Sequence, residues 1–151
     1  MASPVADCFI CEKHRLGDEA EGGVLFEDGL LYVGHVHAIA GPTAYRGQIV
    51  VEPKRHVRGL GELNDVEAEA VGRTISRMAR LLHDAVGAEH VYMWVIGDEV
   101  PHLHVQLVPR FPNTPREYWG PRLLRWPHAP RVDPMEMRTL ISALRDQFAA
   151  S

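Results

Sequence analysis

The segment HLHVQLV, from His102 to Val108, alternates polar with aliphatic side chains and lies between Pro101 and Pro109. Strict alternation predicts a β-strand, because successive side chains of a strand point to opposite faces of the sheet. One face would carry three polar side chains, namely His102, His104 and Gln106. The other would be buried through Leu103, Val105 and Leu107. Two imidazoles and an amide on one face favour a functional site over isolated structural histidines.

Further strands are predicted by short apolar runs that end at turn residues. Asp28-Gly29 would form the turn of a β-hairpin. The next strand after this hairpin would end at Pro53. A fourth strand would turn back into the His102–Val108 segment through an acidic loop, Gly97–Pro101. The expected strands are 24–27, 30–37, 48–52, 90–96 and 102–108.

Two helices are predicted by capping signals and by apolar residues at helical spacing. Asn64 with Glu67 forms a capping box, and Gly87 ends that helix. Asp133 would cap the second helix, with Pro134 in its first turn. The expected core positions are Val71, Ile75, Met78 and Leu82 in the first helix and Met137, Leu140, Ile141, Leu144 and Phe148 in the second.

The order of these elements predicts one antiparallel α+β domain. We expect its core to span about residues 8–110, with a C-terminal loop and helix over 111–151. The proline-rich segment 109–130 contains Trp119 and Trp126, so we expect an ordered loop packed over the sheet. A glycine-rich phosphate loop after a strand is missing, which argues against Rossmann and P-loop folds.

Composition narrows the range of partners. The chain has 151 residues, 16 basic and 20 acidic, with a net charge of −4 and no cluster of Lys or Arg. General binding to nucleic acid or to an anionic membrane is therefore disfavoured, whereas a single nucleotide needs only a local site. The sequence lacks a signal-peptide pattern and a long apolar run, so we expect a soluble cytoplasmic protein.

Cys8 and Cys11 form a C-x-x-C pair, which is half of a tetrahedral zinc site. His56 and His102 are the best candidates for the other two ligands, since each lies at the end of a predicted strand or turn segment. Four protein ligands leave no open position, so such a zinc ion would be structural. The alternative is a pair of reduced thiols without a metal.

His104 lies in the middle of the polar face and is the candidate nucleophile. A neutral imidazole can attack phosphorus once a hydrogen bond to its other nitrogen fixes the tautomer. Gln106 can donate a hydrogen bond to a non-bridging oxygen, but it has no proton to give to a leaving group. Leaving groups that depart as stabilised anions are therefore expected, which favours nucleotidyl transfer over phosphoramidate hydrolysis.

These residues resemble the histidine triad superfamily, whose signature is His-x-His-x-His followed by two apolar residues. The resemblance covers most of the chain, including the cysteine pair, the segment Gly47–His56, the central helix and His102–Arg110. With glutamine at the third position, the motif is similar to the galactose-1-phosphate uridylyltransferase and dinucleoside polyphosphate phosphorylase branches. Members of those branches form a nucleotidylated middle histidine.

The resemblance implies a five-stranded antiparallel sheet with two helices, commonly in a homodimer whose sheet continues across the interface. It implies His104 as nucleophile, Gln106 as a phosphoryl contact, and zinc on Cys8, Cys11, His56 and His102. The chain departs from the pattern in three places. Its 151 residues are far fewer than those of the two-domain uridylyltransferases, so a sugar-phosphate acceptor pocket does not carry over. The loop 97–101 is acidic and short, so it would have to point away from the phosphate, or the substrate is bound otherwise. His35 and His37 stand where an Asp or Asn normally meets the ribose.

His35 and Arg110 are the candidate nucleotide or phosphate contacts. The expected function is that of a nucleotidyltransferase or nucleotide hydrolase, of the dinucleoside polyphosphate type, acting at an α-phosphate. Two alternatives remain. One is a non-catalytic nucleotide-sensing domain kept folded by zinc. The other is a hydrolytic enzyme in which His102, His104 and a third ligand hold a metal-bound water.

Overall fold

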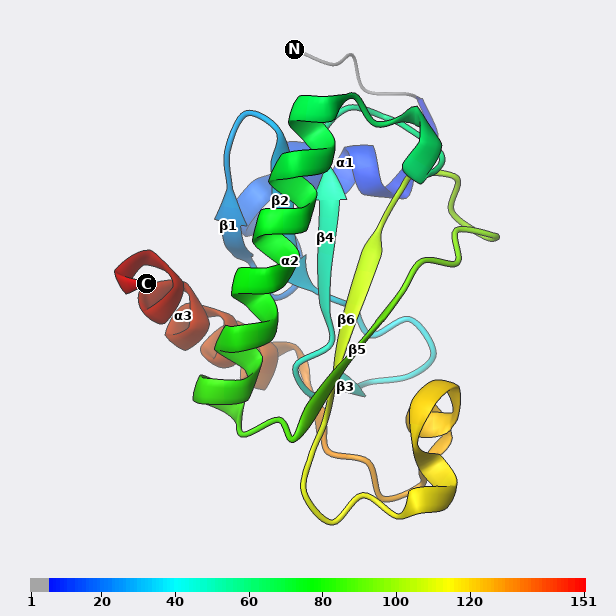
Figure 1. The fold of residues 1–151 in the computed structure, drawn as a ribbon, viewed down its shortest axis with the longest axis vertical. Coiled ribbons are helices and arrows are strands. Elements are labelled where there is room, and N and C mark those ends of the chain that lie inside the picture. The colour runs from blue at the N-terminus through cyan, green and yellow to red at the C-terminus, as the bar shows by residue number, and fades with distance from the viewer. Residues whose placement is uncertain (1–5) are drawn as a thin grey trace.

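A computed structural model describes residues 6–151 of the chain, and its main element is an antiparallel five-stranded sheet (Figure 1). The strand order is β1-β2-β4-β6-β5, and every neighbouring pair is antiparallel. The predicted α+β class is thereby confirmed. The strands are β1 Val24–Glu27, β2 Leu31–His35, β4 Ile49–Pro53, β5 His90–Trp94 and β6 Val105–Arg110.

Two long helices pack on one face of this sheet, and both begin where the sequence predicts. Helix α2 spans Asp65–Val86 and helix α3 spans Pro134–Ala150, and each starts with a complete capping box. Gly87 ends α2 in the left-handed conformation, at φ 79°. Both helices contribute to the main core, where Met78 and Ile141 pack with Val51, Leu103 and Leu107 of the sheet side. None of the helices described is both long and apolar enough to cross a membrane.

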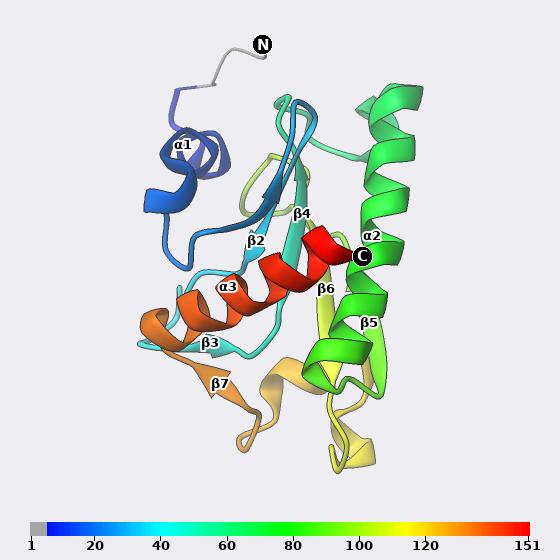
Figure 2. The same cartoon turned by 90° about the vertical axis from the view of Figure 1, so that its left-hand side faces the viewer.

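A third helix, α1 Phe9–Leu16, was not predicted and lies on the other side of the sheet from α2 (Figure 2). Cys8 is its N-cap, and its sulfur accepts a hydrogen bond from the Cys11 amide. The helix has only eight residues and buries Ile10, Cys11 and Lys13, so it lacks the long apolar stripe that identifies α2 and α3.

The predicted strand over 102–108 begins three residues late, at Val105. The ladder with β4 ends at the pair Val51–Val105, and the next position of β4 in phase is Pro53, which has no N–H to donate. The Leu103 amide instead donates to the Val57 carbonyl. His102 and His104 therefore precede the strand, although Leu103, Val105 and Leu107 are buried as expected.

The proline-rich segment after β6 is ordered and packed over the sheet, as predicted. It forms two short 3-10 helices, Arg116–Tyr118 and Gly120–Arg125, and its end pairs as β7 Arg131–Val132 with β3 Ala44–Tyr45. Leu123 and Ala129 of the segment are buried with Val108 and Tyr45. Trp94 packs against this cluster, so the segment supports the sheet next to Gln106, the cross-strand partner of Trp94.

Candidate functional site

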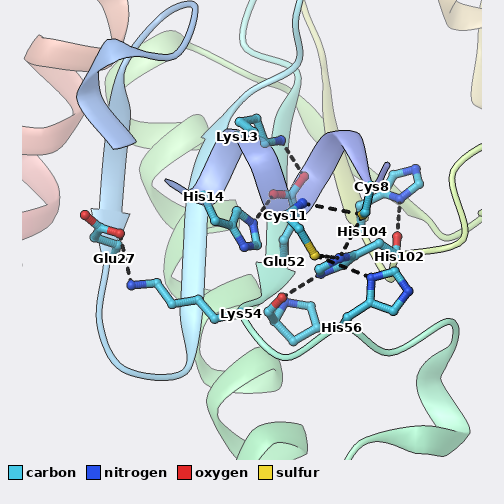
Figure 3. A network of polar contacts seen from close by, with 11 residues as sticks. Cys8, Cys11, Lys13, His14, Glu27, Glu52, Lys54, His56, His102 and His104 are labelled. Atoms are coloured by element: carbon cyan, nitrogen blue, oxygen red, sulfur yellow. Dashed lines mark hydrogen bonds and ion pairs between the residues drawn. The ribbon is translucent and has the colours of Figure 1, made fainter. Parts of the chain in front are cut away.

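Four potential metal ligands converge where α1 meets the segment before β6 (Figure 3). One ligand atom from each of Cys8, Cys11, His56 and His102 lies within 4.8 Å of the others. Nδ1 of His102 is 3.6 Å from Sγ of Cys8 and 3.5 Å from Sγ of Cys11, and Nδ1 of His56 is 3.5 Å from the Cys11 sulfur. The four residues named from the sequence could therefore hold a metal ion together.

His102 is prepared for this role by its second ring nitrogen. Nε2 lies 2.8 Å from the Pro53 carbonyl, and since a carbonyl can only accept, Nε2 carries the proton. The Nδ1 lone pair is then directed at the two cysteine sulfurs, as metal-ligating histidines require. Burial lowers the pKa of His102 to about 4, which keeps the ring neutral. The ring is fully buried.

His104 is held by the same stretch of backbone but does not join the cluster. Its Nδ1 donates to the carbonyl of His102 over 2.7 Å, so in the neutral ring Nε2 carries the lone pair. The side chain is partly exposed and lines a pocket. This geometry fits a nucleophile and contradicts the alternative in which His104 is a metal ligand.

The pocket beside His104 has a volume of about 100 Å³ and lies between α1 and the sheet. Its apolar lining comes from Phe9, Ile10, Val36, Ile39, Val50 and Val100. Its polar lining comes from Lys13, His37, Glu52, His104 and Gln106. Of the acidic loop 97–101, Val100 lines the pocket while Asp98 and Glu99 are exposed, so the loop directs its charges away from the site.

A buried ion pair joins α1 to β4 in the wall of this pocket (Figure 3). Nζ of Lys13 lies 2.6 Å from one oxygen of Glu52, and Nε2 of His14 lies 2.8 Å from the other. Burial raises the pKa of Glu52, but the Lys13 charge and the His14 hydrogen bond outweigh it, and the net pKa is lowered. The carboxylate thus stays ionised although it is 1% exposed. No sequence signal pointed to this pair, because it depends on where α1 docks.

Gln106 faces the same pocket from β6, with its amide oxygen already engaged. Oε1 accepts hydrogen bonds from Nε2 of Gln48 at 2.6 Å and from Nε1 of Trp94 at 3.1 Å. The amide nitrogen is left for another acceptor, which suits a donor to a phosphoryl oxygen. Gln48 and Trp94 were not predicted as site residues.

His35 does not reach the pocket, contrary to its predicted nucleotide contact. It is 1% exposed, its Nδ1 donates to the Val36 carbonyl, and its Nε2 accepts from the Gly47 amide. His37, two residues further, lines the pocket, and its Nε2 is buried with no hydrogen-bond partner among the described residues. Burial, helped by the Lys13 charge, lowers the pKa of His37.

Arg110 also lies away from the reaction pocket. It is four residues beyond Gln106 on β6, which corresponds to about 13 Å along a strand. Its guanidinium lies 3.6 Å from the ring centroid of Trp119 and donates to the Tyr92 hydroxyl. These contacts fasten the segment after β6 to the sheet, and they do not support the predicted phosphate contact.

Comparisons with known proteins agree with this fold. No family model and no curated protein matches the chain. The solved structure of SMU.412c from Streptococcus mutans is 30% identical, with 74% of this chain and 70% of that one covered, at a TM-score of 0.60. A hypothetical histidine triad nucleotide-binding protein from Sulfolobus tokodaii is 18% identical over 95% of this chain and 93% of its own, at a TM-score of 0.70. A Zn-bound histidine triad family protein from Mycobacterium smegmatis is also 18% identical, over 95% and 96%, at 0.63.

Replacing Cys8 by serine should remove the metal while it preserves the helix cap, because serine is a good N-cap residue. A metal present at about 1,000 times its dissociation constant stabilises a fold by about 4 kcal/mol. For a chain of this size that corresponds to a fall in Tm of about 8–16 °C. Elemental analysis and thermal melts, with and without a chelator, measure both effects. Exposed His128→Ala should retain the metal, and wild-type protein that purifies without metal would contradict the site.

The buried His35 should make the protein lose stability in mild acid. Burial lowers its pKa to about 4, against about 6.5 for an unfolded histidine. As the pH falls below 6.5 the unfolded chain takes up the proton first, so the free energy of unfolding decreases. Between pH 7 and pH 5 this contribution is about 2 kcal/mol. Urea unfolding of His35→Gln, which keeps one donor and one acceptor, should show that much less pH dependence, whereas exposed His128→Gln should match the wild type. Equal slopes for wild type and His35→Gln would refute this account.

Proposed function

Because the chain shares the fold of histidine triad proteins, we propose that it is a nucleotide-binding enzyme that acts at an α-phosphate through a nucleotidyl-histidine intermediate. One observation carries the proposal. Nδ1 of His104 is bonded to a carbonyl, which leaves Nε2 for attack, and the Gln106 amide nitrogen faces the same pocket. The Sulfolobus tokodaii protein with the same fold is described as nucleotide-binding.

The proposed reaction has two displacements at phosphorus. Nε2 of His104 attacks the α-phosphorus, a P–N bond forms, and the P–O bond to the leaving group breaks with its electron pair on the departing oxygen. The Nδ1 proton stays on the ring, where the His102 carbonyl stabilises the positive charge that develops. The oxygen of a water or another acceptor then forms a new P–O bond, and the P–N bond breaks with its electron pair on Nε2. Any proton of the acceptor is released to solvent, and neutral His104 is restored.

Gln106 determines which leaving groups are suitable. Its amide can stabilise charge on a non-bridging oxygen, but it cannot protonate a departing atom. General acid assistance is worth about 10² to 10⁴ in rate, so alkoxide and amine leaving groups are disfavoured. Phosphate esters and polyphosphates depart as stabilised anions, which supports a nucleotidyltransferase or a hydrolase of dinucleoside polyphosphates. Both activities are expected for the His-x-His-x-Gln branch that the motif of this chain resembles.

The metal is proposed to be structural zinc. Zinc bonds of about 2.3 Å to sulfur and 2.0–2.1 Å to nitrogen, at tetrahedral angles, separate the two ligand atoms by about 3.5–3.6 Å. Three of the four S···N pairs in the cluster lie at 3.5, 3.5 and 3.6 Å. Four protein ligands would fill the tetrahedron and leave no position for a reactive water.

His37, rather than His35, is proposed to contact the nucleotide. Its buried Nε2 is unpaired among the described residues and lies in the wall of the pocket that contains His104. A buried polar atom without a partner is costly, and a ligand hydroxyl or amino group would satisfy it.

Mixing the protein with diadenosine tetraphosphate, ATP or UDP-glucose should give an acid-labile mass increase of one nucleotidyl group. The adduct should be absent in His104→Ala, and turnover should fall by more than about 1,000-fold because the attacking atom is lost. Intact-protein mass spectrometry after rapid quenching measures the adduct, with His128→Ala as the control. Nucleotide binding without adduct or turnover would instead favour the non-catalytic sensing domain.

A homodimer is proposed from the open edge of the sheet. Strand β5 pairs with β6 on one side, and in the described part of the chain no strand pairs with its other side. Met93 is 56% exposed on this strand and Ile96 is 62% exposed just after it. An exposed edge of this kind is suited to pairing with a second copy about a two-fold axis.

Sedimentation of the wild type should therefore give twice the mass of the chain. Met93→Lys should weaken the dimer at least 10-fold by placing like charges near the axis. Met135→Lys changes a methionine that is 79% exposed on α3 and should leave the dimer intact. A monomeric wild type, or equal effects of the two substitutions, would rule out this interface.

A further inference from the structure

The amide of Gln106 is oriented by two neighbouring side chains, one on each side of β6. Trp94 of β5 is its direct cross-strand partner, and Gln48 lies just before β4, two residues from its other partner Val50. Both donate to the same atom, Oε1 of Gln106, at 3.1 and 2.6 Å.

The Trp94 contact identifies which terminal atom of the Gln106 amide is the oxygen and which is the nitrogen. An indole N–H can donate but cannot accept, so the atom it meets must be the Gln106 oxygen. With the oxygen fixed between two donors, the –NH₂ group must point elsewhere. Rotating the amide by half a turn would bring two pairs of N–H groups together in a partly buried place, which leaves donors unpaired.

From this geometry we infer that Gln48 and Trp94 are positioning residues, which hold the Gln106 amide so that its –NH₂ group meets a non-bridging oxygen of the α-phosphate. The inference rests on the function proposed above. An amide that rotates freely would present its oxygen to the phosphate part of the time and repel it. Locking the amide before the substrate arrives removes that loss, which is how preorganised donors act on a transition state.

The proline-rich segment after β6 also helps to position Gln106, because it packs against Trp94. Trp94 packs against the cluster of Tyr45, Val108, Leu123 and Ala129, and the last two residues belong to that segment. Leu123 is fully buried there. The segment therefore restrains the Trp94 ring, and through Trp94 it contributes to the orientation of the Gln106 amide.

Two substitutions separate positioning from simple folding. Trp94→Phe keeps the ring and removes the donor, while Gln48→Glu keeps the shape and replaces a donor by an acceptor that attracts the Gln106 –NH₂ group. We expect kcat to fall about 10-fold in Trp94→Phe and about 100-fold in Gln48→Glu, with KM changed less than about 3-fold. Gln147→Glu is the matched control, because it makes the same exchange at an exposed position of α3, away from Gln106 and its neighbours.

The decisive measurement uses the two α-phosphorothioate diastereomers of whichever nucleotide forms the His104 adduct. In the wild type, sulfur at the oxygen that Gln106 contacts should slow adduct formation more than sulfur at the other oxygen. The ratio of the two rates should move toward one in Trp94→Phe and Gln48→Glu and stay unchanged in Gln147→Glu. A merely destabilised protein would slow both diastereomers alike.

The results distinguish failure of the positioning role from failure of the proposed function. An adduct in the wild type with an unchanged diastereomer ratio in both variants would overturn the positioning role and leave the proposed function standing. A wild type that forms no adduct with any nucleotide would overturn the function, and the positioning role with it.

Discussion

His102 connects the cluster of potential metal ligands with His104 through its ring and its backbone carbonyl. Its ring faces Cys8 and Cys11, while its backbone carbonyl accepts the Nδ1 proton of His104. The ring and the carbonyl belong to one residue, which precedes β6, so contacts that hold the ring restrain the backbone at this position. The hydrogen bond from Nε2 of His102 to Pro53 fixes the ring from the side of β4. A structural metal two residues from a nucleophile would thus set the tautomer and direction of that nucleophile without taking part in the reaction.

Helix α1 depends on the same cluster and forms one wall of the pocket. Cys8 begins the helix and Cys11 lies in its first turn, whereas Phe9, Ile10 and the buried Lys13 line the pocket. The pair of Lys13 with Glu52 holds the other end of this contact on β4. Breaking a buried pair leaves one uncompensated charge, which costs about 3–5 kcal/mol. The helix is therefore held at two points, at the cysteines and at Lys13. The pocket exists because both attachments hold α1 against the sheet.

The sequence predicted the elements whose signals are local. The capping box at Asn64, the N-cap at Asp133, the hairpin at Asp28-Gly29 and the buried stripes of α2 and α3 follow from residue type and spacing, and the structure confirms them. The strand at His102 was predicted too long because its end depends on a proline in the opposite strand, which a one-dimensional pattern does not contain. Helix α1 was missed because its stability comes from Cys8, Cys11 and Lys13 meeting partners 39 or more residues away.

The same difference between local signals and long-range contacts explains which site residues could be predicted from the sequence. Cysteine spacing, positions at strand ends and the family resemblance pointed to the four potential metal ligands, and alternation pointed to His104 and Gln106, since those signals lie in the chain itself. Choosing between His35 and His37 required knowing that the Gly47 amide and the Val36 carbonyl occupy both nitrogens of the former. Gln48 and Trp94 could not be recognised because their role arises only from strand register.

The register also explains how an amide can replace an imidazole at the third position of the motif. An imidazole donor has two nitrogens, and either can present a proton, whereas an amide has one end that donates and one that repels a phosphate. A glutamine therefore needs neighbours that engage its oxygen, and the pairs Trp94–Gln106 and Val50–Gln106 bring such neighbours to both sides of β6. The requirement reaches as far as the proline-rich segment, because Trp94 is held by the cluster that this segment completes. The proposed role of Gln106 thus depends on three strands and on the proline-rich segment packed against Trp94, and the motif on an unrelated sheet would not suffice for it.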